Sequence, residues 1–278
     1  MPVEEASWSV DGTRVYGQWH APDKAKSGVV LLHGFSSSLR EFGSLPEHLA
    51  NAGHGVLAID LRGHGLSAGE RGRVDLERAC RDLDAAVAEA ERRLGRKAPL
   101  ALVGHSLGAA LAIGFQARRG RFDRLVAAHP VDRLIDEPGP LERLGYHVLG
   151  RLGALRARSG RSPAMVPRPP KYRDLFEDKA VRAQAKAEGL IAGRLNLGNY
   201  AFATTMQASE WARHVRVPVL GITSPHDRAV QPAHSDHVLD SLDGPVQRLE
   251  HHGGHSCFMD LDRARVFAGI ERFLGAQT

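Results

Sequence analysis

Ser106 is the residue whose surroundings most favour covalent chemistry. It lies in the sequence GHSLG at residues 104–108, between a short apolar run that follows Pro99 and a stretch with apolar and small residues at helical spacing. A G-x-S-x-G sequence that joins a buried strand directly to a helix holds the serine in a strained turn and presents its hydroxyl above the sheet. The flanking glycines leave room for the backbone to fold back on itself. The pattern predicts that Ser106 is a nucleophile.

Leu107 follows the serine and is expected in the first turn of the helix. Its backbone N–H then has no partner within the helix and points to where negative charge would develop on an attacked carbonyl oxygen. Many chains match G-x-S-x-G by chance, but few place it between a strand and a helix. The predicted chemistry is therefore acyl transfer, with Leu107 as one oxyanion donor.

His255 is the candidate general base. It follows the predicted strand 246–250, comes directly after Gly253-Gly254 and precedes the last predicted helix. A histidine in a loop is more often a solvated residue than a base, and the chain contains 15 histidines. His251 and His252 are the nearest competitors. We prefer His255 because the two glycines suit a side chain that must reach over the sheet.

Asp227 is the candidate partner of that base, since it lies just beyond a predicted strand that ends at Thr223. The alternative interpretation is a carboxylate in a surface turn. Asp236 and Asp260 are nearby competitors, but Asp236 falls within a predicted helix and Asp260 is expected to cap one. In such an arrangement the histidine takes the proton of the serine, and the carboxylate fixes the imidazole tautomer and stabilises the imidazolium.

A parallel sheet is the element that must position these residues. An Asp11-Gly12 turn between two alternating runs predicts a hairpin near the N-terminus. Short apolar runs predict buried strands at 29–32, 56–60, 125–128, 217–223 and 246–250, besides the strand that begins at Leu100. Helical spacing predicts helices at about 41–52, 75–94, 107–120, 232–242 and 261–274. Strands that alternate with helices predict a mostly parallel α/β sheet with the serine turn near its middle.

Two further motifs identify a family. The stretch DLRGHGLSAGERGRV at 60–74 matches D-x-R-G-H-G-x-S-x-G-x-R-G-x-V, and HGF at 33–35 matches an H-G-x loop. With these motifs, residues 29–130 and 215–274 resemble the α/β-hydrolase superfamily, and within it the monoacylglycerol lipase and lysophospholipase-like branch. The chain order serine, aspartate, histidine is also that of the superfamily. The resemblance implies that the backbone N–H of Phe35 is the second oxyanion donor. We assign the 60–74 loop no chemical step.

The resemblance also implies two domains, because residues 131–214 interrupt the alternation of strands and helices. We expect an α/β-hydrolase core at 1–130 and 215–278, and a helical cap, or lid, at 131–214. Apolar positions at helical spacing in the cap are Leu141, Leu144, Val148, Leu152 and Leu155, followed by Phe176, Val181, Tyr200, Phe202, Met206 and Trp211. We expect them to pack the cap on the core. A sharper hypothesis is that some of them line an apolar channel for an acyl chain above the serine.

The cap contains a basic run without an acidic residue, between Arg151 and Arg173. Four prolines in the same segment, Pro163, Pro167, Pro169 and Pro170, predict a loop. A solvated basic face is the ordinary interpretation. A second hypothesis is contact with a phosphate-bearing substrate or an anionic membrane surface, which would make the cap a site of peripheral membrane contact. The basic residues are Arg151, Arg156, Arg158, Arg161, Arg168, Lys171 and Arg173.

Composition excludes several other classes. The net charge of +5 is spread over the chain, which argues against nucleic-acid binding. The N-terminus has no secretory pattern and no apolar run is long enough to span a bilayer, so a cytoplasmic protein is expected. The two cysteines, Cys80 and Cys257, lack the spacing of a disulfide framework or a metal site. The sequence has no signal for an oligomeric state.

The sequence thus predicts an enzyme with a Ser106, Asp227 and His255 triad and with Phe35 and Leu107 as oxyanion donors. It would cleave carboxylic esters of medium to long acyl chains, such as monoacylglycerols or lysophospholipids, through an acyl-enzyme and without a metal or cofactor. Acyl thioesterase, carbon–carbon bond hydrolase, perhydrolase and proline iminopeptidase chemistry remain alternatives on the same fold. A catalytically silent small-molecule binding module is the alternative outside the enzymes.

Overall fold

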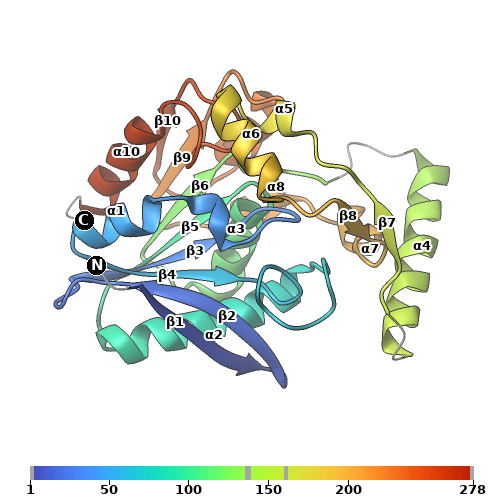
Figure 1. Ribbon diagram of the computed structural model, residues 1–278, viewed down its shortest axis with the longest axis horizontal. Coiled ribbons are helices and arrows are strands. Elements are labelled where there is room, and N and C mark those ends of the chain that lie inside the picture. Colours follow the sequence, from blue (N-terminus) through green and yellow to red (C-terminus); the bar gives the residue numbers. More distant parts are fainter. Residues whose placement is uncertain (1–2, 135–138, 160–161, 276–278) are drawn as a thin grey trace.

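The computed structural model describes residues 3–134, 139–159 and 162–275 (Figure 1). Its centre is a sheet of eight strands in the spatial order β1-β2-β4-β3-β5-β6-β9-β10. The first two strands form an antiparallel hairpin, β2 pairs antiparallel with β4, and the remaining pairs are parallel. The strands are β1 (Val3–Val10), β2 (Thr13–His20), β3 (Ser27–Leu32), β4 (His54–Asp60), β5 (Leu100–His105), β6 (Arg124–Ala128), β9 (Val219–Thr223) and β10 (Val246–Glu250).

Helices cover both faces of this sheet (Figure 1). One face packs on α1 (Leu45–Asn51) and α10 (Arg263–Gly275), the other on α2 (Leu76–Leu94), α3 (Leu107–Arg119) and α9 (Pro232–Asp240). Strand β3 shows the reason for its continuous apolar sequence. Val29 and Leu31 lie in one core cluster, and Val30 and Leu32 lie in the other. A strand buried on both faces needs apolar residues at every position.

Local signals explain most element boundaries. Asp11 and Gly12 both have positive φ, 51° and 75°, which is the geometry of a tight two-residue hairpin turn. The Asp75 side chain caps α2 by accepting from the Arg78 N–H. The predicted helix at 41–52 is in fact two elements, a 3₁₀ turn η1 (Leu39–Phe42) and α1. Gly43, at φ 52°, separates them, since a residue in that conformation ends a helix.

A segment between β6 and β9 is inserted into this framework. It contains α4 (Pro140–Arg158), α5 (Tyr172–Leu175), α6 (Lys179–Ala187), α7 (Asn199–Ala203), α8 (Ala208–Ala212) and a small antiparallel pair, β7 (Met165–Pro167) and β8 (Arg194–Asn196). Part of the proline-rich run predicted as a loop is therefore a strand. Helix α8 packs on α3 and belongs to the core cluster through Ala208 and Ala212.

Helix α4 lies at the edge of the molecule, away from the main sheet (Figure 1). It packs on α7, where Tyr146 and Tyr200 stack with ring centroids 5.0 Å apart. Its apolar stripe does not pack on the core, which corrects the sequence-based expectation. The side chains of Leu141, Leu144, Val148, Leu152 and Leu155 are exposed, Leu141 by 84%. In the part of the chain that the structure describes, no helix is long and apolar enough to cross a membrane.

Candidate active site

The turn between β5 and α3 has the strained geometry that the sequence predicts. Ser106 has φ 54° and ψ −120°, a backbone conformation outside the regions that non-glycine residues normally adopt. Its N–H donates to the Ala128 carbonyl at 2.8 Å. A Cβ at Gly104 would lie 2.5 Å from the Gly108 carbonyl oxygen, and a Cβ at Gly108 would overlap the carbonyl oxygen of Leu32. Both positions therefore require glycine if the serine is to stand at this turn.

Two backbone segments flank Ser106 where an oxyanion would form. Leu107 is the first residue of α3, so its N–H has no partner within the helix. The loop at 33–35 follows β3, and a Cβ added to Gly34 would lie 3.2 Å from the Ser106 Cβ. Phe35 is thus the residue next to the one that packs against Ser106. The Arg168 guanidinium, from the inserted segment, lies over the Phe35 ring at 5.2 Å.

Asp227 and His255 meet beside this turn. The His255 Nδ1–H donates to Asp227 Oδ2 at 2.7 Å, and both residues are buried. The other carboxylate oxygen, Oδ1, accepts from the N–H groups of Ala229 and Val230 at 2.8 and 2.9 Å. Burial alone would raise the pKa of Asp227. The adjacent His255 and the hydrogen bonds that the Asp227 carboxylate accepts instead hold that pKa far below its usual value. Asp227 is therefore an ionised acceptor.

The competing histidines and carboxylates are engaged elsewhere. His252 is exposed and its backbone N–H donates to Asp262, whereas the buried His251 ring contacts His129. Asp236 pairs with Arg248 on the surface. Asp260 accepts backbone N–H groups of Glu177, Asp178 and Gly254, so it ties the inserted segment to the loop before α10. Geometry thus brings together the two residues that the sequence favoured.

His129 is a buried residue at this site that sequence reasoning missed. Its Nδ1–H donates to Asp227 Oδ2 at 2.7 Å, the same oxygen that accepts from His255. Its Nε2 lies 2.8 Å from Nε2 of His251. The available signal was its position, since it directly follows β6 at the edge where the parallel strands end.

Glu41 and His105 form a second buried arrangement that sequence reasoning did not find. Glu41 Oε1 accepts from the Gly34 N–H at 2.7 Å and lies 3.0 Å from His105 Nδ1. His105 Nε2–H donates to the His255 carbonyl at 2.9 Å. Because both ring nitrogens face acceptors, His105 is an imidazolium. Burial opposes both charges, yet mutual attraction raises the pKa of His105 and lowers that of Glu41. The pair thus contacts both the loop at 33–35 and the backbone of the candidate base.

Two groups of side chains in the described residues have metal-like spacing. They are His129, Asp227 and His255, and His129, His251 and Cys257, each with ligand atoms within 4.8 Å of one another. The nitrogens of these histidines that face the other groups are already engaged in the hydrogen bonds described above. Burial also raises the pKa of the Cys257 thiol well above its ordinary value, whereas a metal needs the thiolate. We assign no metal to either group.

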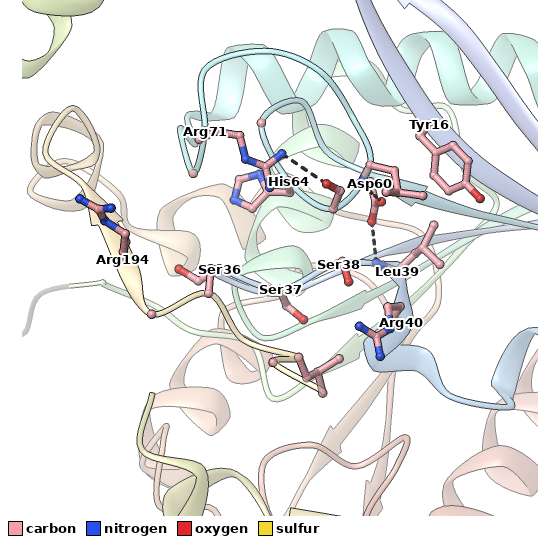
Figure 2. Close-up of a pocket in the computed structure, with 18 of the residues that line it drawn as sticks. Tyr16, Ser36, Ser37, Ser38, Leu39, Arg40, Asp60, His64, Arg71 and Arg194 are labelled. Carbon is pink, nitrogen blue, oxygen red and sulfur yellow. Dashed lines mark hydrogen bonds between the residues drawn. The ribbon is translucent and has the colours of Figure 1, made fainter. Parts of the chain in front are cut away.

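The loop at 60–74 organises the neighbourhood of the site. Asp60 accepts the N–H groups of Leu39 and Leu66 at 2.7 and 2.8 Å, so one carboxylate joins the start of η1 to this loop. Arg62 pairs with the buried Asp82 of α2. Figure 2 shows Arg71 directed at the loop's own backbone, where it donates to carbonyl oxygens of Gly65 and Ser67. These contacts are structural, as expected for this motif.

A cavity of about 660 Å³ opens between this loop, the residues after Phe35 and the inserted segment (Figure 2). The core contributes Ser36, Arg40 and His64, and the inserted segment contributes Met165, Leu190 and Arg194, among others. Ser106, Asp227 and His255 do not line it. The cavity instead includes Ser36, two residues after Gly34, which packs against the Ser106 turn, so it adjoins the site.

Comparison with known proteins identifies the family. Residues 23–262 match the family model described as serine aminopeptidase, S33. The chain belongs to this family of α/β-hydrolases. A monoacylglycerol lipase of Mycolicibacterium smegmatis is 25% identical to it over 98% of the chain and 96% of the relative.

Solved structures resemble this α/β-hydrolase along its whole length. A monoacylglycerol lipase of Paleococcus ferrophilus is 24% identical, with a TM-score of 0.77 over 94% of this chain and 98% of that one. A thermostable carboxyl esterase from Bacillus coagulans is 20% identical, with a TM-score of 0.77 over 99% and 98%. The predicted α/β-hydrolase fold and the monoacylglycerol lipase-like branch are confirmed. The family and its relatives support ester hydrolysis and do not favour the alternative chemistries.

Proposed function

We propose that this protein is a serine hydrolase that cleaves carboxylic esters with Ser106 as nucleophile, His255 as general base and Asp227 as its orienting partner. The observation that carries the proposal is the 2.7 Å hydrogen bond between His255 and Asp227, at strand ends beside the strained Ser106 turn. The three residues come from three loops, after β5, β9 and β10. Such convergence is what a catalytic constellation requires.

The reaction follows from these positions. His255 Nε2 takes the Ser106 proton as Oγ attacks the ester carbonyl, and the resulting imidazolium then protonates the departing alcohol. The acyl-enzyme is resolved by water, which His255 deprotonates in turn, releasing the carboxylic acid and restoring the serine. Asp227 stays ionised throughout, because its hydrogen bonds favour the carboxylate. No metal or cofactor is needed for these steps.

The oxyanion of each tetrahedral intermediate would be held by the N–H groups of Leu107 and Phe35. The start of α3 and the packing of Gly34 against Ser106 support this role. Donors of this kind typically contribute about 10²–10³ in kcat each. The Glu41 contact with the Gly34 N–H fixes the loop that carries Phe35.

We propose that residues 131–214 form a cap over this site and that the substrate is an ester of a medium to long acyl chain, of the monoacylglycerol or lysophospholipid class. The cavity beside the oxyanion loop supports this, since Met165 and Leu190 of the cap line it together with Leu39 and Leu66 of the core. Apolar walls of this kind suit an acyl chain. The contact of Arg168 with Phe35 joins the cap directly to the oxyanion loop.

The test is hydrolysis of p-nitrophenyl esters from acetate to palmitate by the wild type and by Ser106→Ala. Loss of the nucleophile should lower kcat by about 10⁴–10⁶, as in other triads. Ser241→Ala, at the end of α9, is the matched control and should leave the rate unchanged. Activity that survives in Ser106→Ala refutes the proposed nucleophile. A wild type inert on every ester refutes ester hydrolysis and would direct attention to acyl thioesters.

We also propose that the cap contacts a membrane surface through α4. Its exposed leucines and valine form one stripe, and the exposed Arg143, Arg151 and Arg156 lie on the same helix. An amphipathic helix with basic residues binds best to anionic bilayers. Sedimentation with phosphatidylglycerol vesicles should capture the wild type and release Leu144→Ser/Leu152→Ser, whereas the control Leu261→Ser, exposed elsewhere, should still bind. Equal binding by all three proteins would refute the role of α4.

A further inference from the structure

Asp227 receives more hydrogen bonds than a triad aspartate needs to orient one histidine. Oδ1 accepts two backbone N–H groups, and Oδ2 accepts the ring N–H groups of His255 and His129, each at 2.7 Å. His129 belongs to no step of the mechanism above. It is 1% exposed, so its contact with the carboxylate is not a chance surface encounter.

The hydrogen bond from His129 to Asp227 is the last of a series of hydrogen bonds in which each donor and acceptor can be assigned. The Gly253 N–H donates to His251 Nδ1 at 3.1 Å, and a backbone N–H can only donate. His251 Nδ1 is therefore an acceptor, and a neutral His251 carries its proton on Nε2. That proton points to His129 Nε2, 2.8 Å away, which must accept. His129 then carries its own proton on Nδ1 and donates it to Asp227 Oδ2. The position of the ring proton is thereby assigned for both His251 and His129.

The surroundings keep both histidines neutral, as this series of hydrogen bonds requires. Burial lowers the pKa of His129 to about 3, in spite of Asp227, while His255 and His105 oppose its protonation. Burial likewise lowers the pKa of His251 to about 4, although Asp262, Asp227 and Asp260 favour its charged form. A protonated His251 could not accept from Gly253. The tautomers are therefore unchanged across the neutral pH range.

We infer that His129 and His251 are positioning residues of the hydrolytic reaction, which deliver a fixed N–H to Asp227 and hold Oδ2 in line with His255. The inference rests on the proposed triad. The carboxylate is clamped on both oxygens, by backbone on Oδ1 and by two imidazoles on Oδ2. Rotation about its Cβ–Cγ bond would break all of these bonds, so the His255 ring keeps the tautomer and orientation that catalysis needs.

The His129 N–H also tunes the charge that His255 experiences. A donor on Oδ2 draws electron density from the carboxylate and weakens its attraction for the His255 imidazolium. Loss of this donor should strengthen the attraction between the carboxylate and the imidazolium, so the acidic limb of the kcat/KM profile should move to higher pH. Simple loss of packing would not move that limb.

The first experiment determines the tautomers in the wild-type protein. Two-bond ¹H–¹⁵N correlation spectra of ¹⁵N-histidine-labelled protein distinguish protonated from unprotonated ring nitrogens, and His129→Asn and His251→Gln assign the signals by their disappearance. We expect His129 protonated on Nδ1 alone and His251 on Nε2 alone from pH 6 to 8. His129 protonated on Nε2, or either ring doubly protonated at pH 7, would overturn the inference. This readout does not depend on turnover, so it separates a failure of the inference from a failure of the proposed function.

The second experiment uses two substitutions of equal size. In His129→Asn the side-chain amide can still donate from the Nδ1 position, whereas His129→Leu has the same shape and no donor. Charge-assisted hydrogen bonds of this kind predict a fall in kcat of about 10- to 100-fold for His129→Leu, with KM nearly unchanged and the acidic limb shifted upward. His129→Asn should stay within a few fold of the wild type. Asparagine also tolerates the positive φ of 48° at this position.

A second matched pair keeps the inference testable if His129→Leu does not fold. His251→Gln can still donate toward His129 from the Nε2 position, and His251→Met cannot. We expect His251→Met to lower kcat and shift the pH profile in the same direction as His129→Leu, and His251→Gln to resemble the wild type. Equal kinetics and equal pH profiles within each pair would show that these histidines act through packing alone, which would overturn the inference.

Discussion

Replacement of Glu41 by glutamine tests the buried pair that Glu41 and His105 form next to the loop at 33–35. In the wild type the Glu41 carboxylate accepts from the Gly34 N–H and from the His105 imidazolium. Glu41→Gln keeps the shape and one acceptor oxygen but removes the charge. Without that charge, burial makes the imidazolium unfavourable and His105 loses a proton. Breaking a buried ion pair costs about 3–5 kcal/mol, and we expect about 3 kcal/mol because His105 can become neutral.

The destabilisation caused by Glu41→Gln should depend on pH, in a direction fixed by the pKa shifts of Glu41 and His105. The pKa of Glu41 is lowered from 4.5, so its contribution to stability is present above pH 4.5 and is lost as the pH falls. The pKa of His105 is raised from 6.5, so its contribution is complete below pH 6.5 and is lost as the pH rises through the folded-state value. The difference between wild type and Glu41→Gln should therefore be largest between pH 4.5 and 6.5.

Urea unfolding from pH 4 to 9 measures this difference. At its maximum, about 3 kcal/mol corresponds to a fall in Tm of roughly 6–12 °C for a domain of this size. Glu47→Gln, which removes an exposed carboxylate of α1, is the control and should change stability by less than about 1 kcal/mol at any pH. A difference that stays flat over the whole pH range, or that matches the control, would refute the assignment of a charged Glu41–His105 pair.

Two further predictions concern the framework of the site. Gly108→Ala should lower kcat more than 100-fold or prevent folding, because the added Cβ overlaps the Leu32 carbonyl, whereas Gly145→Ala on α4, whose Cβ would meet open space, should leave activity intact. Near-normal activity in Gly108→Ala would contradict the described turn. Asp82→Asn should destabilise by about 3 kcal/mol, measured by urea unfolding, since it removes the buried ionic partner of Arg62 and leaves the half-exposed Asp11 to pair with it. The surface variant Asp84→Asn is its control, and equal effects of the two would show that the Arg62–Asp82 pair is not important.

Much of the framework could be predicted from the sequence because its signals are local. The buried strands follow from continuous apolar runs such as 29–32, and the hairpin follows from Asp11-Gly12. The turn at Ser106 is recognised from a local pattern, in which Gly104 is required by backbone within the turn and Gly108 by the Leu32 carbonyl of the neighbouring β3. Asp227 and His255 could be proposed because each follows a strand, and parallel strands end at the same edge of a sheet. Their catalytic roles stay predictions.

Sequence patterns did not predict the features that depend on contacts with a distant part of the chain. The apolar stripe of α4 has the spacing of a buried helix face, but α4 lies at the edge of the molecule, where its leucines are exposed. Helical spacing shows that a helix is amphipathic and does not show what covers its apolar face. The strand β7 was missed for a related reason, since its partner β8 is supplied by a distant part of the inserted segment.

The contacts between buried polar groups depend on the tertiary structure alone. His129 and His251 are 122 residues apart, and Glu41 and His105 are 64 apart. Each pair meets only because β3, β5, β6, β9 and β10 lie in a particular order in the sheet. No local pattern distinguishes these residues from solvated loop residues, and burial is what forces each polar atom to find a partner. The sequence by itself therefore predicted the strands of the main sheet, the turn and the candidate catalytic side chains, whereas the order of the strands decided which buried groups support them.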